Sequence, residues 1–133
     1  MLKTVLDTHA LIWYLYGDNR LSKLARQTIE EIENNGDTAA FSSISLAEIV
    51  YLSEKGRISP ETLKRLLMAM DKENALLIEI PFERNIAVTL KNIDRSEIPD
   101  LPDRIIAATA LYLGVSLISR DQKIRLSKIN TIW

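Results

Sequence analysis

Four acidic side chains stand where they can meet at one site, either after apolar runs or at the start of helical segments. Asp7 and Asp121 follow runs that predict strands, whereas Glu48 and Asp103 lie in the first turns of segments with helical spacing. In an open parallel sheet, ligands bind beyond the carboxyl ends of the strands, so these acids can face one crevice. Each acid also has a local interpretation, because strand-end aspartates cap turns and Ser45 with Glu48 fits a capping box.

The atoms that a cluster of acids offers determine which metal ion it can bind and which reaction it can catalyse. If the four carboxylates converge, their mutual repulsion raises their pKa values unless a divalent cation neutralises them. The chain has no cysteine and a single histidine, so a metal site must be built mainly from oxygen, which favours Mg²⁺ or Mn²⁺ over zinc. Such a site suits phosphodiester hydrolysis, since one ion lowers the pKa of the attacking water and a second stabilises the leaving oxygen.

The surroundings of Asp103 require a positive partner. Beyond it, small apolar residues follow at helical spacing: Ile106, Ala107 and Ala110. Asp100 is the expected N-cap of the same helix, and an acid in the first turn gains about 0.3–1 kcal/mol from the helix dipole. A carboxylate on a buried stripe needs compensation, which we expect from Arg104, another basic side chain or a metal ion.

Other residues beside these acids are candidates for secondary roles. Thr8 and Ser119 can donate hydrogen bonds to carboxylates or to a bound phosphate, and either can equally cap the helix that follows it. His9 is favoured as a polar contact at a helix start over a catalytic role. Basic residues of the closing segment form either a phosphate-steering surface or a solvated face: Arg120, Lys123, Arg125 and Lys128. Three aromatic residues suit base stacking or, more commonly, packing: Trp13, Tyr14 and Tyr16.

Short apolar runs alternate with helical segments along the chain. Strands are predicted at residues 3–6, 39–42, 75–80, 115–118 and 131–133. Helices are predicted at residues 10–16, 22–34, 45 to the stop at 56, 60–71, 82–93 and 102–113, with a short helical turn before the last strand. The strands lack an alternation of polar residues, which indicates a parallel sheet covered by helices on both faces. Since no repeat or long linker divides the chain, we expect residues 1–133 to form one α/β domain.

Composition excludes several classes of protein. With 47% hydrophobic and 26% charged residues the chain is globular in composition, and its net charge of −1 argues against a broad positive surface for duplex binding. No apolar run approaches the roughly 20 residues that cross a bilayer, and the first residues lack the pattern of a signal peptide. The absence of cysteine fits a reducing compartment. We therefore expect a cytoplasmic protein without a membrane partner.

The ordered motifs resemble those of the PIN-domain family, and in particular the VapC-like toxin ribonucleases of bacterial toxin–antitoxin pairs. Residues 5–13, VLDTHALIW, are similar to the first strand and acid of that family. The segment SLAEI at 45–49 resembles its glutamate helix, and EKGRI at 54–58 resembles the stretch that follows this helix. DLPDRIIAATA at 100–110 and LISRD at 117–121 resemble its later acidic motifs. No single motif is specific, but four in order span nearly the whole chain.

The resemblance implies a fold, an activity and partners. It implies a three-layer αβα domain with a parallel sheet of four to five strands in the order 3-2-1-4-5. It gives metal-binding roles to Asp7, Glu48, Asp103 and Asp121, with Asp7 and Asp103 as direct ligands. It further implies homodimerisation, RNA cleavage that leaves a 3′-hydroxyl and a 5′-phosphate, and a cognate antitoxin that covers the pocket. Leu101–Pro102 stands where the family commonly has proline followed by an aromatic residue, which puts the geometry of this loop in doubt.

Two other classes of function fit parts of the pattern. A non-catalytic PIN-like module would bind RNA or a protein partner without turnover, although all four acids are retained here. A phosphoacceptor receiver domain requires an aspartate at the end of the third strand, where this chain has Ile80 and Pro81. A nicotinamide-binding domain requires a glycine-rich turn after the first strand, which is missing.

Overall fold

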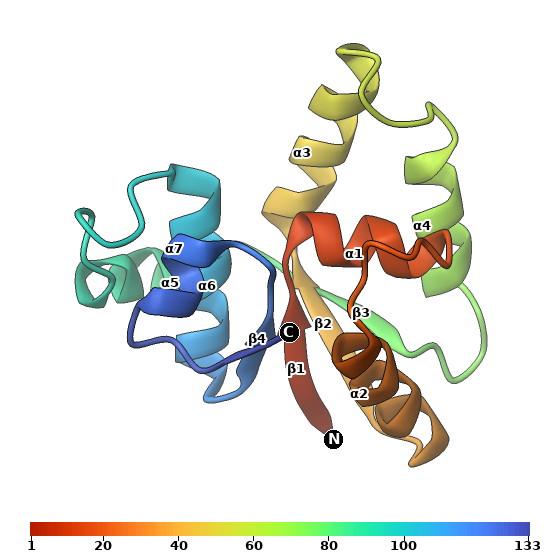
Figure 1. The fold of residues 1–133 in the computed structure, drawn as a ribbon, viewed down its shortest axis with the longest axis horizontal. Coiled ribbons are helices and arrows are strands. Elements are labelled where there is room, and N and C mark those ends of the chain that lie inside the picture. Colours follow the sequence, from red (N-terminus) through yellow and green to blue (C-terminus); the bar gives the residue numbers. More distant parts are fainter.

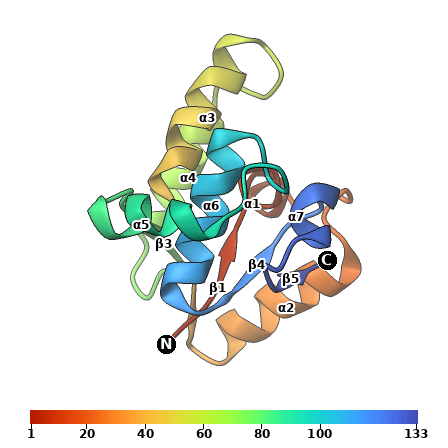
Figure 2. The same ribbon diagram turned by 90° about the vertical axis from the view of Figure 1, so that its left-hand side faces the viewer.

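A computed structural model describes the whole chain, from Met1 to Trp133. Its centre is a five-stranded sheet in the order β3-β2-β1-β4-β5, in which every neighbouring pair is parallel. Figure 1 labels β1 to β4, and Figure 2 labels β5. The strands are β1 (Leu2–Leu6), β2 (Thr38–Ser42), β3 (Leu77–Ile80), β4 (Ser116–Ile118) and β5 (Thr131–Ile132). The predicted α/β class and strand order are confirmed.

Helices cover both faces of this sheet. They are α1 (Thr8–Leu15), α2 (Lys23–Asn34), α3 (Ser43–Glu54), α4 (Thr62–Met70), α5 (Arg84–Thr89), α6 (Leu101–Leu113) and α7 (Gln122–Leu126). Figure 1 shows α1, α2 and α4 on one side of the sheet and α5, α6 and α7 on the other. In both ribbon views α3 extends beyond the end of the strands (Figure 2). None of the helices is both long and apolar enough to span a bilayer.

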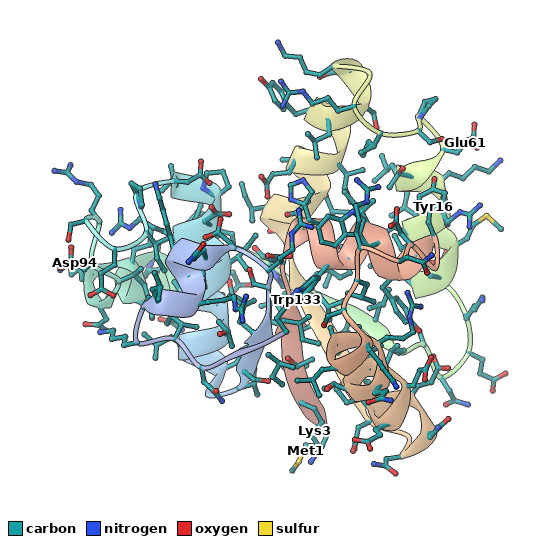
Figure 3. The ribbon with its side chains drawn as sticks, viewed as in Figure 1. Met1, Lys3, Tyr16, Glu61, Asp94 and Trp133 are labelled. Carbon is teal, nitrogen blue, oxygen red and sulfur yellow. The ribbon has the colours of Figure 1, made fainter.

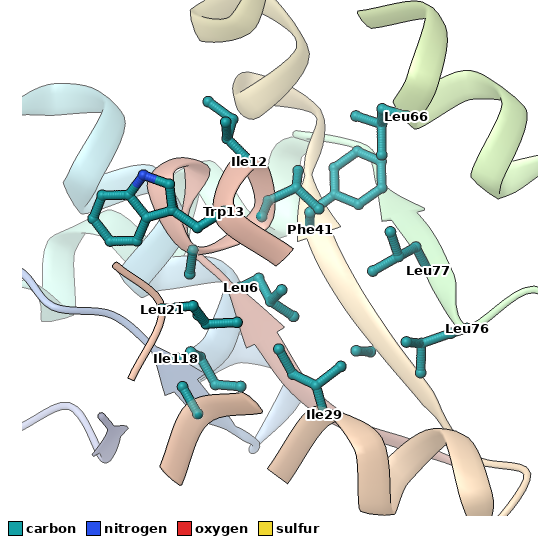
Figure 4. Close-up of a cluster of buried hydrophobic side chains, with 14 of the residues drawn as sticks. Leu6, Ile12, Trp13, Leu21, Ile29, Phe41, Leu66, Leu76, Leu77 and Ile118 are labelled. Atoms are coloured by element: carbon teal, nitrogen blue, oxygen red, sulfur yellow. The ribbon is translucent and has the colours of Figure 1, made fainter. Parts of the chain in front are cut away.

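Consecutive residues of the central strands supply two separate cores. On the side of α1 and α2, Leu6 and Phe41 are fully buried in one cluster (Figure 4), whereas Val5 and Ala40 are buried against α6 on the other side. Complete burial of a large apolar side chain contributes about 1.5–3 kcal/mol. Since both faces of each strand are buried, β1 and β2 carry no polar alternation, as a parallel sheet requires.

Two helices begin at positions that differ from those predicted. Ser42, and not Ser45, is the N-cap of α3, because its hydroxyl oxygen accepts a hydrogen bond from the Ile44 amide at 3.2 Å. The capping box predicted for Ser45 and Glu48 is therefore wrong. Helix α4 begins at Thr62, since the Ser59 oxygen accepts the Glu61 amide and forms a turn before the helix.

The segment predicted as one helix from 82 to 93 is shorter and ends differently. It consists of α5 followed by one 3₁₀ turn, η1 (Leu90–Asn92). The Arg104 guanidinium donates to the carbonyl oxygens of Leu90 and Ile93 at 3.0 and 3.1 Å. These bonds satisfy carbonyls that a longer helix would have used, and they join this segment to α6.

Candidate functional site

The parallel register places the ends of β1 and β4 side by side. Leu6 lies opposite Ile118, and the Asp7 amide donates to the Ile118 carbonyl at 3.1 Å. Asp7 and Ser119, the next residue of each strand, therefore leave the sheet at the same edge. This edge is the carboxyl end at which ligands bind in parallel sheets. Met1 and Lys3 mark the opposite end of β1 (Figure 3).

A pocket of about 330 Å³ opens at this edge. Its lining comes from four separate stretches of the chain: Asp7, Thr8, His9, Trp13, Glu48, Asp100, Asp103, Arg120 and Asp121. The four acids singled out in the sequence thus share one pocket, together with Asp100. Thr8 and His9 also line it, whereas Arg104 does not.

Asp7 is both a helix cap and a pocket residue. Its Oδ1 accepts a hydrogen bond from the Ala10 amide at 2.9 Å, which caps α1, and only 8% of the residue is exposed. Burial raises the pKa of Asp7, while the nearby Ser119 hydroxyl and the Ala10 amide oppose this rise. The local and the functional interpretations are therefore compatible, because the Ala10 amide that caps α1 is bonded only to Oδ1.

Glu48 is oriented by a short chain of hydroxyl groups. The Thr8 hydroxyl donates to Oε1 of Glu48 at 2.5 Å and lies 2.8 Å from the Ser45 hydroxyl. Since the single Thr8 proton goes to Glu48, Ser45 must donate to Thr8. Burial raises the pKa of Glu48, the Thr8 hydrogen bond lowers it and Asp100 raises it further. Thr8 therefore orients this carboxylate, a role that its sequence position allowed but did not determine.

Asp103 combines a position in the first turn of a helix with a raised pKa. It lies in the first turn of α6, where its amide donates to the Asp100 side chain at 3.1 Å, so the predicted Asp100 cap is confirmed. The pKa of Asp103 is raised to about 7, first by burial and then by repulsion from its acidic neighbours: Asp100, Asp121, Glu48 and Asp7. Of the three compensating groups expected for Asp103, Arg104 is excluded, because its guanidinium donates to the carbonyls of Leu90 and Ile93.

Asp121 completes the acidic lining and caps the short helix α7. Its Oδ1 accepts from the Ile124 amide at 3.1 Å, and its own amide donates to the Ser119 hydroxyl oxygen at 3.0 Å. Ser119 directly follows β4 and is fully buried, so its hydrogen bond with the Asp121 amide is shielded from solvent. Asp121, and not Ser119, is the N-cap of α7, so the alternative of Ser119 as a helix cap is wrong. The role of Ser119 as a donor to carboxylates or to a phosphate stays a prediction.

The oxygen donors of the pocket suit a hard divalent cation. Five carboxylates converge on one opening, and three of them have a raised pKa: Asp7, Glu48 and Asp103. A cation would relieve this repulsion. As the side chains stand, however, no group of three His, Asp or Glu residues is close enough together to hold an ion. The donor chemistry therefore fits Mg²⁺ or Mn²⁺, since Mg²⁺ commonly binds through one or two carboxylates and keeps several water ligands.

The sequence left Trp13 between base stacking and packing, and Arg120 between phosphate steering and a solvated face, and both residues line the pocket. Trp13 is its single hydrophobic lining residue and is 4% exposed, and the His9 ring lies 5.6 Å from the Trp13 ring, one helical turn away on α1. The guanidinium of Arg120, which follows β4 in the chain, lies over the ring of Trp13. The spacing of four between His9 and Trp13 was a usable signal, whereas the approach of Arg120 depends on the pairing of β1 with β4.

A second and larger hollow, of about 820 Å³, lies away from these acids. It is bordered by α1, α2, α4 and the start of β3, with half of its lining hydrophobic, and includes Tyr14, Lys64, Met68 and Leu76. Its acidic and basic side chains are intermixed along the lining. The clustered charge that chemistry requires is thus confined to the smaller pocket.

The double role of Asp100 leads to a prediction. Asparagine is as good an N-cap as aspartate, so Asp100→Asn is expected to change the free energy of unfolding by no more than about 0.5 kcal/mol. It also removes a negative neighbour, so the pKa of Asp103 should fall below about 7. Side-chain NMR titration of Asp103 measures this shift, with Asp94→Asn as a distant control. An unchanged Asp103 pKa would show that Asp100 has no electrostatic part in the pocket.

Comparison with known proteins identifies the family. The family model described as PIN domain matches residues 4–129. Ribonuclease VapC22 of Mycobacterium tuberculosis is 30% identical over 125 residues, which cover 94% of this chain and 92% of the relative. A Klebsiella pneumoniae toxin–antitoxin complex contains a similar chain, with a TM-score of 0.69, 26% identity, and coverage of 98% and 97%. VapBC2 from Rickettsia felis, bound to a promoter DNA fragment, has the same fold, with a TM-score of 0.71, 21% identity, and coverage of 99% and 98%. The chain therefore belongs to the PIN domain family.

Proposed function

We propose that this protein is a divalent-metal-dependent endoribonuclease and the toxin of a toxin–antitoxin pair. The observation that carries the proposal is the convergence of four acids from distant segments on one pocket: Asp7, Glu48, Asp103 and Asp121. Burial and the repulsion among these acids raise the pKa of Asp103, and a bound divalent cation would offset both effects. The ribonuclease relative supports RNA as the substrate.

The side chains at this site have two kinds of proposed role, as metal ligands and as residues that position those ligands. Asp7 and Asp103 would hold Mg²⁺ or Mn²⁺ directly, and Glu48 and Asp121 would do so directly or through water. When bound, the ion lowers the pKa of a water molecule and neutralises charge on the phosphodiester. Thr8 fixes the orientation of Glu48 through its hydroxyl, and Ser119 supports Asp7 and Asp121. Asp100 caps α6 and adds negative potential at Asp103.

The proposed substrate and partners follow from the size of the pocket and from the similar structures. An opening of about 330 Å³ suits a flexible single strand or loop of RNA better than a duplex. The toxin–antitoxin complexes among the similar structures support a cognate antitoxin as protein partner. We further propose that residues 1–133 act as a single domain, and that the protein is a homodimer in the cytoplasm.

A cleavage assay tests the proposal directly. Purified protein is incubated with a mixture of single-stranded RNAs, and the products are resolved and their ends identified. We expect cleavage with Mg²⁺ or Mn²⁺, no cleavage with excess EDTA, recovery on adding Mn²⁺, and products that carry a 5′-phosphate. Full activity in excess EDTA would contradict the proposed metal dependence.

A second candidate function is a non-catalytic module that binds RNA or a protein. The observation that favours it is the spacing of the acids, no three of which are close enough, as they stand, to hold an ion. RNA binding without turnover across Mg²⁺ and Mn²⁺ titrations would support this function. Metal-dependent cleavage would exclude it.

A further inference from the structure

The acidic pocket contains one basic side chain that has no acidic partner. Arg120 is the single Lys or Arg residue of the lining, beside five carboxylates. The structure contains two ion pairs, Met1 with Asp37 and Arg20 with Asp18, and Arg120 takes part in neither. A guanidinium beside so many carboxylates normally pairs with one of them, so its position needs another cause.

The position of Arg120 is explained by the indole ring of Trp13. The guanidinium carbon lies 4.7 Å from the ring centroid, within the range of a cation–π contact. The ring itself is fixed, because Trp13 is 4% exposed and packs at 5.9 Å against Trp133. Trp13 therefore holds the Arg120 charge at the edge of the pocket, apart from the carboxylates.

We propose that Arg120, held by Trp13, binds a non-bridging phosphate oxygen of the RNA strand that enters the pocket. This inference rests on the proposed function, because it takes RNA as the ligand. Five carboxylates repel a polyanion, and a guanidinium offers paired N–H donors that match a phosphate. Since Arg120 is not paired with an acid, binding a phosphate breaks no ion pair and removes no carboxylate from the metal ligands.

Arg20 provides a matched control on the same ring. Its guanidinium lies 5.3 Å from the Trp13 centroid, but it is paired with Asp18 through contacts of 2.7, 3.1 and 3.2 Å. Arg20 is also absent from the pocket lining. Replacing Arg20 removes the same type of residue from the same aromatic ring, and leaves the proposed phosphate contact in place.

The test measures binding of a fluorescein-labelled single-stranded RNA by anisotropy, in excess EDTA and over a series of salt concentrations. Arg120→Ala is expected to raise Kd about tenfold, because it removes a charge-assisted contact. The slope of log K against log salt should become shallower by about 0.7, as expected for one phosphate contact on a single strand. Arg120→Lys should restore the slope with part of the affinity, and Arg20→Ala should match the wild type in both.

A variant of Trp13 tests the positioning role of the ring. Trp13→Phe keeps an aromatic residue in the core but offers a weaker surface for a cation, so its Kd should lie between those of the wild type and Arg120→Ala. In Mg²⁺, Arg120→Ala should raise KM more than it lowers kcat. Far-UV circular dichroism confirms that each variant is folded.

The outcomes separate this inference from the proposed function. A Kd and salt slope of Arg120→Ala equal to those of the wild type would overturn it, and so would equal losses in Arg120→Ala and Arg20→Ala. Failure of the wild type to bind RNA would also overturn it. A wild-type protein that binds RNA through Arg120 but cleaves none in Mg²⁺ or Mn²⁺ would overturn the proposed catalysis and support the phosphate contact.

Discussion

Replacing Asp7 or Asp103 with asparagine is expected to lower the rate of RNA cleavage by about 100-fold or more. Each substitution removes one negative charge from a proposed metal ligand, and a bound ion supplies several kcal/mol of transition-state stabilisation. Asparagine keeps the size of the side chain and, at Asp7, can still accept the Ala10 amide that caps α1. Steady-state cleavage of a defined RNA in Mg²⁺ measures the loss.

The stability of these variants distinguishes a lost ligand from a lost fold. Burial raises the pKa of both Asp7 and Asp103, so the ionised carboxylates destabilise the metal-free protein near neutral pH. The asparagine variants should therefore unfold in EDTA at the same temperature as the wild type or higher, although they are inactive. Glu31→Gln, on the exposed face of α2, is the control for loss of an acidic charge and should keep full activity. Retained activity in both pocket variants would contradict the proposed site.

The sheet was predictable because its strands are short, apolar on both faces and separated by helices. Val5 and Leu6 are buried on opposite faces of the sheet, and burial on both faces is what a run of apolar residues without polar alternation predicts. The first residues of the helices were less predictable, since several serines could cap α3. Ser42 is the cap because its hydroxyl accepts the Ile44 amide, and the Ser45 hydroxyl bonds instead with Thr8, which lies 37 residues away in sequence. A local pattern cannot contain such a contact.

The positions of the acids at the ends of the strands were predictable from the parallel sheet, but the contacts of their neighbours were not. Parallel strands end at one edge, so acids that follow β1 and β4 lie near each other once the pairing is known. The partner of Asp103 could not be found in this way. Arg104 is adjacent in sequence, but it reaches the carbonyls of Leu90 and Ile93 because α6 packs beside η1. The contact of Arg120 with Trp13 likewise depends on tertiary structure.

Metal binding is expected to reverse the dependence of stability on pH. The pKa of Asp103 is raised from 3.8 to about 7, so between about pH 4 and 7 the folded state binds a proton more tightly than the unfolded state does. Raising the pH through this range removes that proton, and the metal-free protein should become less stable. The causes are burial and four facing carboxylates: Asp100, Asp121, Glu48 and Asp7. Asp103→Asn should flatten this dependence.

A divalent ion binds the ionised carboxylates, so it should have little effect at pH 5 and a large one at pH 8. At a concentration of 100 times its Kd, an ion that binds only the folded state adds about 2.7 kcal/mol, which raises Tm by on the order of 10 °C for a chain of this size. Thermal unfolding with EDTA or Mn²⁺ at both pH values measures the effect. Asp7→Asn and Asp103→Asn should lose most of the gain at pH 8, and Glu31→Gln should keep it. An equal rise in Tm for all variants would place the ion outside the acidic pocket, because only a site built from these carboxylates connects metal affinity to the ionisation of Asp103.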